Sequence, residues 1–140
     1  MKILIARSRA PVLLVAGALL VIVAASILVF PGEFYAANDI RAGVSASLLN
    51  ELKAPAGFLL VAGLYVIAAI FVARFTDAAL ALAAAIYLSY AGSRFASMLF
   101  DGVPAEGLVQ AALLEAVVGL ACLAVALVRR PGIARMTWCW

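Results

Sequence analysis

The chain of 140 residues is 69% hydrophobic and only 12% charged, with a mean hydropathy of +1.22 and a net charge of +3. About a quarter of the residues of a soluble domain are charged, so this composition excludes a water-soluble globule and indicates an integral membrane protein whose main partner is the lipid bilayer. The basic residues stand in short segments beside apolar runs, which argues against a nucleic-acid partner and is typical of charges that orient membrane spans.

Four apolar runs are long enough for helices that cross a hydrocarbon core, which takes roughly 20 residues each. Pro31 and Gly32 end the first run, which is longer than the roughly 7–15 apolar residues of a signal peptide, so we interpret it as a span. Pro55 stands where the second span should begin. Thr76 or Asp77 could cap the third span. The expected spans cover about 11–30, 56–74, 78–100 and 107–129.

The loop over residues 31–55 is too long for a simple turn, whereas the next two loops are short. Its segment Ser45–Lys53 has a helical pattern, so we expect a short helix that either lies on the membrane surface or extends the second span outward. The short loops should make the second, third and fourth spans pack as consecutive hairpins. The predicted fold is therefore all-α: one membrane domain over residues 1–140, an antiparallel up-down-up-down four-helix bundle.

The distribution of lysine and arginine predicts the orientation of the spans, because these residues are enriched on the cytoplasmic side. The other side holds Arg41 and Lys53 among several acidic residues. This asymmetry predicts both termini in the cytoplasm, including a tail over residues 130–140 in which Trp138 and Trp140 suit a membrane interface. The basic residues on the predicted cytoplasmic side are Lys2, Arg7, Arg9, Arg74, Arg129, Arg130 and Arg135.

Two charged residues interrupt the third and fourth apolar runs, Arg94 and Glu115. Arg94 lies about 10 Å inward from Asp101, and Glu115 about 12 Å inward from Gly107, at 1.5 Å per helical residue. Since a short turn joins the two spans on that side, the two charges should lie at similar depth. Charged groups inside a membrane normally face the bundle and find partners, so we expect an ion pair between them.

A polar stripe surrounds this expected pair, because Tyr87, Tyr90, Arg94, Ser97 and Asp101 are separated by three or four residues. The pair could be purely structural, locking two helices together. The cluster could instead bind a small polar ligand, a lipid headgroup or a proton, or the charges could extend toward the lipid interface. The candidate ligand-binding residues, in an outward-facing pocket, are Glu51, Tyr87, Tyr90, Arg94, Asp101 and Glu115. On the fourth span, Gly119 and Cys122 share the face of Glu115, where glycine permits close helix approach.

The residues needed for common catalytic and metal sites are missing from the sequence. There is no histidine, and the two cysteines, Cys122 and Cys139, are placed too differently to form a redox pair. No glycine-rich phosphate loop occurs. We therefore predict no catalytic residues, no metal and no cofactor.

The sequence contains several short motifs in and beside the last three spans, namely Leu49–Gly57, Gly92-Ser93-Arg94, Asp101–Pro104 and Glu115. Together they resemble the bacterial domain-of-unknown-function family 4345, whose members are small four-helix membrane proteins distantly similar to DoxX-like bundles. The resemblance covers about residues 10 to 130. Lys53 and Pro55-Ala56-Gly57 depart from the family's Leu-Arg-Ala-x-Gly-Gly stretch. The family implies a fold and no established activity.

Three functions are compatible with these features. The first is an accessory or scaffold subunit of the bacterial inner membrane, which packs against itself or a larger membrane complex, since small-residue faces such as Ala62-Gly63 favour close helix packing. The second is a binder or carrier of a small polar or amphipathic ligand around Arg94 and Glu115. The third, a redox or isomerase enzyme of the membrane, rests on the DoxX-like analogy alone.

Overall fold

The computed structural model describes residues 9–40 and 45–128, and all regular structure within these two ranges is helical. Four of the helices are apolar and long enough to cross a membrane, whose hydrocarbon core takes roughly 20 helical residues. The prediction of four long apolar helices is confirmed. In chain order the elements are α2 (Arg9–Val29), α3 (Pro31–Ala36), α4 (Ala46–Ala68), the 3-10 turn η1 (Ala73–Phe75), α5 (Thr76–Phe100) and α6 (Glu106–Leu127).

The second long helix begins nine residues earlier than Pro55 suggested. Ser45 caps α4, because its Oγ accepts a hydrogen bond from the Leu48 N–H at 3.1 Å. Segment 46–53 is therefore the first part of α4 and not a separate helix, and Pro55 lies inside the helix. Pro55 has no N–H to bond the carbonyl of Glu51, and Glu51 is exposed near the end of the molecule, where this loss is tolerated. A separate short helix, α3, directly follows α2 instead.

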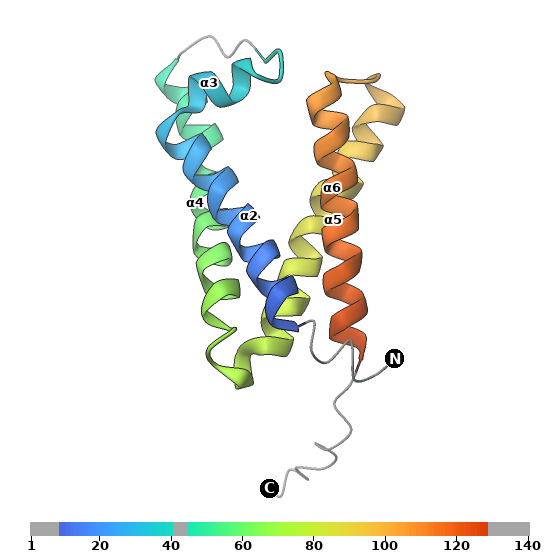
Figure 1. Cartoon of the computed structure of the whole chain (residues 1–140). Helices are drawn as coiled ribbons and strands as arrows, with labels where there is room; N and C mark the ends of the chain where they lie inside the picture. The colour runs from blue at the N-terminus through green and yellow to red at the C-terminus, as the bar shows by residue number, and fades with distance from the viewer. Residues whose placement is uncertain (1–8, 41–44, 129–140) are drawn as a thin grey trace, which may run out of the picture.

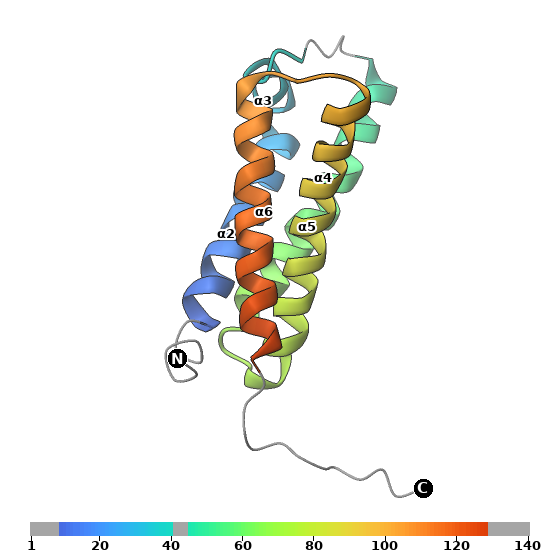
Figure 2. The same cartoon turned by 90° about the vertical axis from the view of Figure 1, so that its right-hand side faces the viewer.

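The long helices form two closely packed pairs, α2 with α4 and α5 with α6, while contacts between the pairs are sparse. In Figure 1 one pair lies on each side of the molecule; the pairs converge at the lower end and are separated at the upper end, beneath α3. Figure 2 shows α5 and α6 side by side along their length. The consecutive hairpins expected for the last three long helices are found for α5 with α6, whereas α4 packs mainly against α2 and has only a few contacts with α5. The short link over residues 69–75 joins the ends of α4 and α5.

Glycines explain which helices pair. A Cβ atom on Gly63 of α4 would lie 2.9 Å from the Gly17 carbonyl oxygen of α2, and one on Gly17 would lie 2.9 Å from the Gly63 carbonyl oxygen. The two backbones thus meet at a point that admits no side chain. In the other pair, a Cβ on Gly119 would lie 2.8 Å from the Leu88 side chain. The close approaches predicted at Gly63 and Gly119 are confirmed.

Arg9 joins three helices at the lower end of the bundle. Its side chain is buried, and its Nη1 forms an ion pair with Asp77 in the first turn of α5. Its Nη2 donates to the Val128 carbonyl oxygen at the end of α6, at 3.0 Å. A cation is favourable at the carboxyl end of a helix. Neither Thr76 nor Asp77 caps α5 through its side chain; the hydroxyl of Thr76 instead donates to the Ala69 carbonyl oxygen at 3.3 Å.

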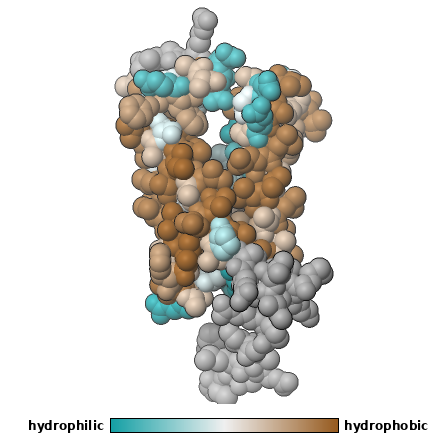
Figure 3. Space-filling view, in the orientation of Figure 1, coloured by the Kyte–Doolittle hydropathy of each residue, from teal (hydrophilic) through white to brown (hydrophobic). Residues whose placement is uncertain are grey.

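Much of the outside of the bundle is apolar. In Figure 3 hydrophobic side chains cover the middle of the visible face, while hydrophilic ones gather toward the upper end and the lower corner. Phe71, Leu99 and Phe100 are 82%, 82% and 86% exposed. Exposed apolar surface of this extent marks contact with a membrane or another protein, and the length and hydropathy of the four long helices fit a membrane environment.

Several residues used for the orientation argument lie outside the described residues, together with the whole tail over 130–140. Within the described ranges, Arg74 and the buried Arg9 lie at one end of the bundle, and Lys53 lies near the other. The predicted positions outside these ranges are Lys2, Arg7, Arg41, Arg129, Arg130, Arg135, Trp138, Cys139 and Trp140.

Candidate functional site

A cavity of about 360 Å³ lies between the two helix pairs, in the half of the molecule beneath α3. Its size falls in the lower part of the range of roughly 300–1,000 Å³ that is usual for small-molecule sites. All four long helices and the α3 segment line it. The space-filling view shows it as a hollow between the pairs, open to the side of the bundle, with hydrophilic groups at its edge (Figure 3). The cavity lies where the two pairs diverge.

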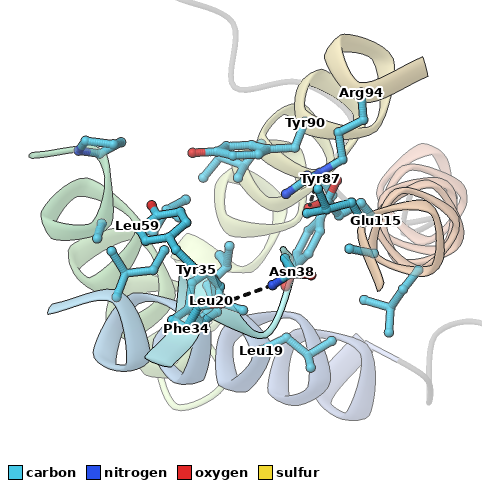
Figure 4. Close-up of a pocket in the computed structure, with 18 of the residues that line it drawn as sticks. Leu19, Leu20, Phe34, Tyr35, Asn38, Leu59, Tyr87, Tyr90, Arg94 and Glu115 are labelled. Atoms are coloured by element: carbon cyan, nitrogen blue, oxygen red, sulfur yellow. Dashed lines mark hydrogen bonds and ion pairs between the residues drawn. The ribbon is translucent and has the colours of Figure 1, made fainter. Parts of the chain in front are cut away.

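Arg94 and Glu115 form an ion pair at one wall of the cavity. Arg94 Nε donates to Glu115 Oε2 at 3.0 Å and to Oε1 at 3.3 Å. The side chains are 32% and 15% exposed, so both are largely removed from the surroundings of the bundle. Figure 4 shows the guanidinium extending from α5 toward the centre of the cavity, with Glu115 reaching it from α6. Both residues are therefore placed where a ligand could contact them.

Tyr87 lines the same cavity, but its hydroxyl already has a structural partner. It donates to the Ala16 carbonyl oxygen of α2 at 2.7 Å, and the side chain is 5% exposed. This bond joins α5 to α2, across the two pairs. The ring of Tyr87 therefore forms part of the cavity wall, while its hydroxyl stabilises the fold through the bond to Ala16.

Tyr90 and Tyr35 bring two further hydroxyl groups to the cavity, from α5 and α3. In Figure 4 both rings extend into the space between the pairs. Burial raises the pKa of Tyr35; the nearby Tyr90 raises this pKa further, whereas the charge of Arg94 lowers it. The Tyr35 hydroxyl consequently stays protonated at neutral pH and can donate a hydrogen bond.

Asn38, which follows α3, bridges the two helix pairs at the upper end of the cavity. Its Nδ2 donates to the Phe34 carbonyl oxygen at 3.1 Å, which fixes the amide. A Cβ on Gly107, at the start of α6, would lie 2.8 Å from Asn38 Oδ1. The absence of a side chain at position 107 therefore lets the segment after α3 reach the other pair at the edge of the cavity.

Two candidate residues do not line the cavity, Glu51 and Asp101. Both are exposed, and Asp101 accepts a hydrogen bond from the Ser97 hydroxyl at 2.8 Å. Asp101 lies on the same face of α5 as Arg94 but roughly 10 Å further along the axis, and it does not line the cavity. The structure thus brings Tyr87, Tyr90, Arg94 and Glu115 together and leaves the other two outside.

The sequence gives little indication of the α3 segment and of the apolar walls. Tyr35 and Asn38 belong to a loop whose path cannot be read from periodicity, although its aromatic pair Phe34-Tyr35 is unusual for a solvent-exposed connection. The apolar walls are formed by residues of the same types as those that face lipid, so the sequence does not distinguish the two groups. The main apolar lining residues of α2 and α4 are Leu19, Leu20, Val23, Ile27, Leu52, Ala56 and Leu59.

The cavity combines apolar walls with polar groups gathered at one end. Hydrocarbon buried against the walls is stabilised by about 25 cal/mol per Å², while the polar end can form hydrogen bonds. Among the residues that the structure describes, no group of three or more Cys, Asp and Glu side chains is placed to hold a metal ion. The cavity thus offers an apolar surface along its walls and hydrogen-bonding groups at one end.

The comparison with known protein families agrees with the motifs found in the sequence. The model of the family described as "Domain of unknown function (DUF4345)" matches residues 10–126. This range includes every residue that lines the cavity. It also includes all four long helices, apart from the first residue of α2 and the last residue of α6. No curated protein and no solved structure matches the chain. The chain therefore belongs to the DUF4345 family.

Proposed function

We propose that this protein is a multi-pass membrane protein whose four spans cross the bilayer alternately as an antiparallel bundle, with both termini in the cytoplasm. The positive-inside distribution of lysine and arginine supports this orientation. It places the end with Arg9 and Arg74 at the cytoplasmic side and the cavity in the outer half of the membrane. A bacterial inner membrane is the location that fits the family resemblance.

Within this arrangement the protein binds a small amphipathic molecule in the cavity between the helix pairs. One observation carries the proposal: an apolar cavity of about 360 Å³ has its polar groups, Arg94 and Glu115, concentrated at one wall. A site with apolar walls and a few convergent polar groups is the usual form of a small-molecule site. Its opening to the side of the bundle, visible in Figure 3, gives access to molecules dissolved in the bilayer.

The test is photolabelling in phosphatidylcholine nanodiscs with a long-chain alcohol that carries a diazirine in its chain. Labelling should concentrate on cavity residues such as Leu20 and Leu59. Ala111→Phe, which fills the cavity from α6, should remove this labelling. Ala124→Phe is the matched control, because Ala124 is exposed on the same helix away from the cavity. Labelling confined to the lipid-facing surface, unchanged by Ala111→Phe, would refute the proposal.

The sequence alone favoured an accessory or scaffold subunit, in contact with another membrane protein or a second copy. The cavity leads us to favour ligand binding over a scaffold function, because packing between proteins does not need an open site with an ion pair in its wall. The interaction with a partner remains a prediction. Extraction in a mild detergent followed by measurement of the particle mass would test it: a strictly monomeric particle would count against the scaffold function.

A further inference from the structure

We propose that the polar end of the cavity selects a head group that carries no net charge and accepts hydrogen bonds, such as a ketone or ester carbonyl, and rejects anionic head groups. Arg94 and Glu115 act there as one neutral unit that donates hydrogen bonds. This inference rests on the proposed function, because it specifies the ligand of that same cavity.

The first argument is the charge of the cavity. Among the described residues that line it, Arg94 and Glu115 are the charged ones, and their contact at 3.0 Å makes the net charge of the wall zero. An anionic head group that approached the guanidinium would also approach the carboxylate of Glu115. If it displaced Glu115 from Arg94, it would leave a carboxylate unpaired in an apolar site, which is strongly unfavourable. The pair therefore offers no net attraction to an anion.

The second argument is the set of hydrogen-bond donors that remain. Both described bonds from Arg94 to Glu115 leave from Nε, so the two terminal nitrogen atoms of the guanidinium are not needed for the pair. A guanidinium offers five N–H donors and no acceptor. Figure 4 shows this group directed into the cavity, between Tyr90 and Glu115. A ligand that presents acceptor atoms matches this end of the cavity.

The other polar groups of the wall reinforce the same preference. The hydroxyl of Tyr87 is committed to Ala16, and the amide of Asn38 donates to Phe34. Tyr90 and Tyr35 have no hydrogen-bond partner among the described residues, so both hydroxyls can donate to a ligand. The carboxylate of Glu115 faces Arg94, while the four terminal N–H groups of the guanidinium and the two tyrosine hydroxyls can all donate to a ligand. A carbonyl oxygen, with two acceptor positions and no proton, satisfies them without adding charge.

Glu115→Gln gives the sharpest test, because the amide keeps the shape of the side chain and can still accept a hydrogen bond from Arg94. The substitution removes the negative charge and leaves Arg94 as an uncompensated cation. The wall then attracts anions instead of excluding them. The preference of the cavity should consequently reverse from a neutral to an anionic head group.

The experiment uses two probes of equal chain length, each with a diazirine at the same carbon: an alkyl methyl ketone and an alkyl sulfonate, which stays charged at all relevant pH values. Each is incorporated into phosphatidylcholine nanodiscs with the wild-type protein, and labelling of cavity residues is quantified by mass spectrometry. In the wild type the ketone should label the cavity at least about tenfold more than the sulfonate, because a sulfonate that enters an apolar site of zero net charge loses its hydration without gaining a net counter-charge. In Glu115→Gln the sulfonate should exceed the ketone.

The outcomes separate the inference from the proposed function. If the sulfonate labels the wild-type cavity as strongly as the ketone, the head-group inference is overturned while the binding function stands. If neither probe labels the cavity, the proposed function fails. The comparison in the wild type does not depend on any variant, so it remains decisive if Glu115→Gln does not fold. If the variant folds, as judged by its thermal unfolding in detergent, an unchanged preference for the ketone would also overturn the inference.

Discussion

The glycine crossing between α2 and α4 leads to a quantitative prediction about stability. A Cβ on Gly63 would lie 2.9 Å from three atoms, the Gly17 carbonyl oxygen, Leu20 Cβ and Val21 Cγ2. The first two cannot rotate away, because they belong to the backbone or are attached directly to it. Since ordinary contacts between carbon atoms are about 3.5–4.0 Å, Gly63→Ala must push the two helices apart by several tenths of an ångström.

The cost of such overpacking is typically about 1–3 kcal/mol. Alanine also favours a helix over glycine by up to about 1 kcal/mol, so the effect of Gly63→Ala alone would mix two terms. Gly57→Ala on the same helix separates them, because no heavy atom lies within 4 Å of a Cβ at that position. The helix-propensity gain is common to both variants. Their difference in the free energy of unfolding therefore isolates the steric term, and should be about 1–3 kcal/mol with Gly63→Ala the less stable.

The assay is reversible unfolding in mixed micelles, with sodium dodecyl sulfate as the denaturant and far-ultraviolet circular dichroism as the signal. Free energies of unfolding are compared at the same mole fraction of denaturant. Gly57→Ala should be at least as stable as the wild type. A Gly63→Ala variant equal to or more stable than Gly57→Ala would show that α2 and α4 do not meet at this point, and the pairing described above would be wrong.

Two further predictions concern bonds that join the helix pairs. Tyr87→Phe removes the hydroxyl that donates to Ala16 and should lower the free energy of unfolding by about 0.5–1.5 kcal/mol, because the carbonyl of Ala16 loses this bond but keeps its partner within α2; an unchanged value in the same denaturant titration would contradict the bond. Arg9→Met should destabilise more than Asp77→Asn, since Arg9 is buried and also bonds Val128, whereas the Asp77 side chain is 74% exposed and exposed ion pairs contribute only about 0–1 kcal/mol. Equal losses in thermal unfolding for these two variants would mean that the Val128 contact contributes nothing.

The candidate site illustrates how far depth along a helix can predict contact. Arg94 and Glu115 could be placed at the same level because a short turn joins their helices and each residue adds a fixed rise of 1.5 Å. The stripe of three- and four-residue spacings also included Asp101, which shares the face of Arg94 but does not line the cavity. Glu51 was also counted among the candidate ligand-binding residues and is exposed on the first part of α4. Periodicity gives the face and the height of a residue, but not where a cavity ends.

The role of Arg9 shows the same limit in another way. Its position before the first apolar run was sufficient to assign it to the cytoplasmic side, because lysine and arginine near span ends follow a rule of position. That it is buried, and that it joins the starts of α2 and α5 to the end of α6, depends on how three segments distant in sequence come together.

The sequence by itself determined that this protein fits a membrane environment and contains four long apolar helices, and it placed two charges at one depth between the last two. These properties are local: hydropathy, helix length and rise per residue need no knowledge of neighbouring helices. Only the tertiary structure decided that α2 pairs with α4, that the pairs diverge, and that the segment after α3 meets Gly107 at the edge of the cavity. The physical reason is that the missing Cβ of a glycine affects helix pairing only where a second backbone lies against it. A cavity likewise depends on the side chains of several helices, so the sequence of one helix cannot indicate it.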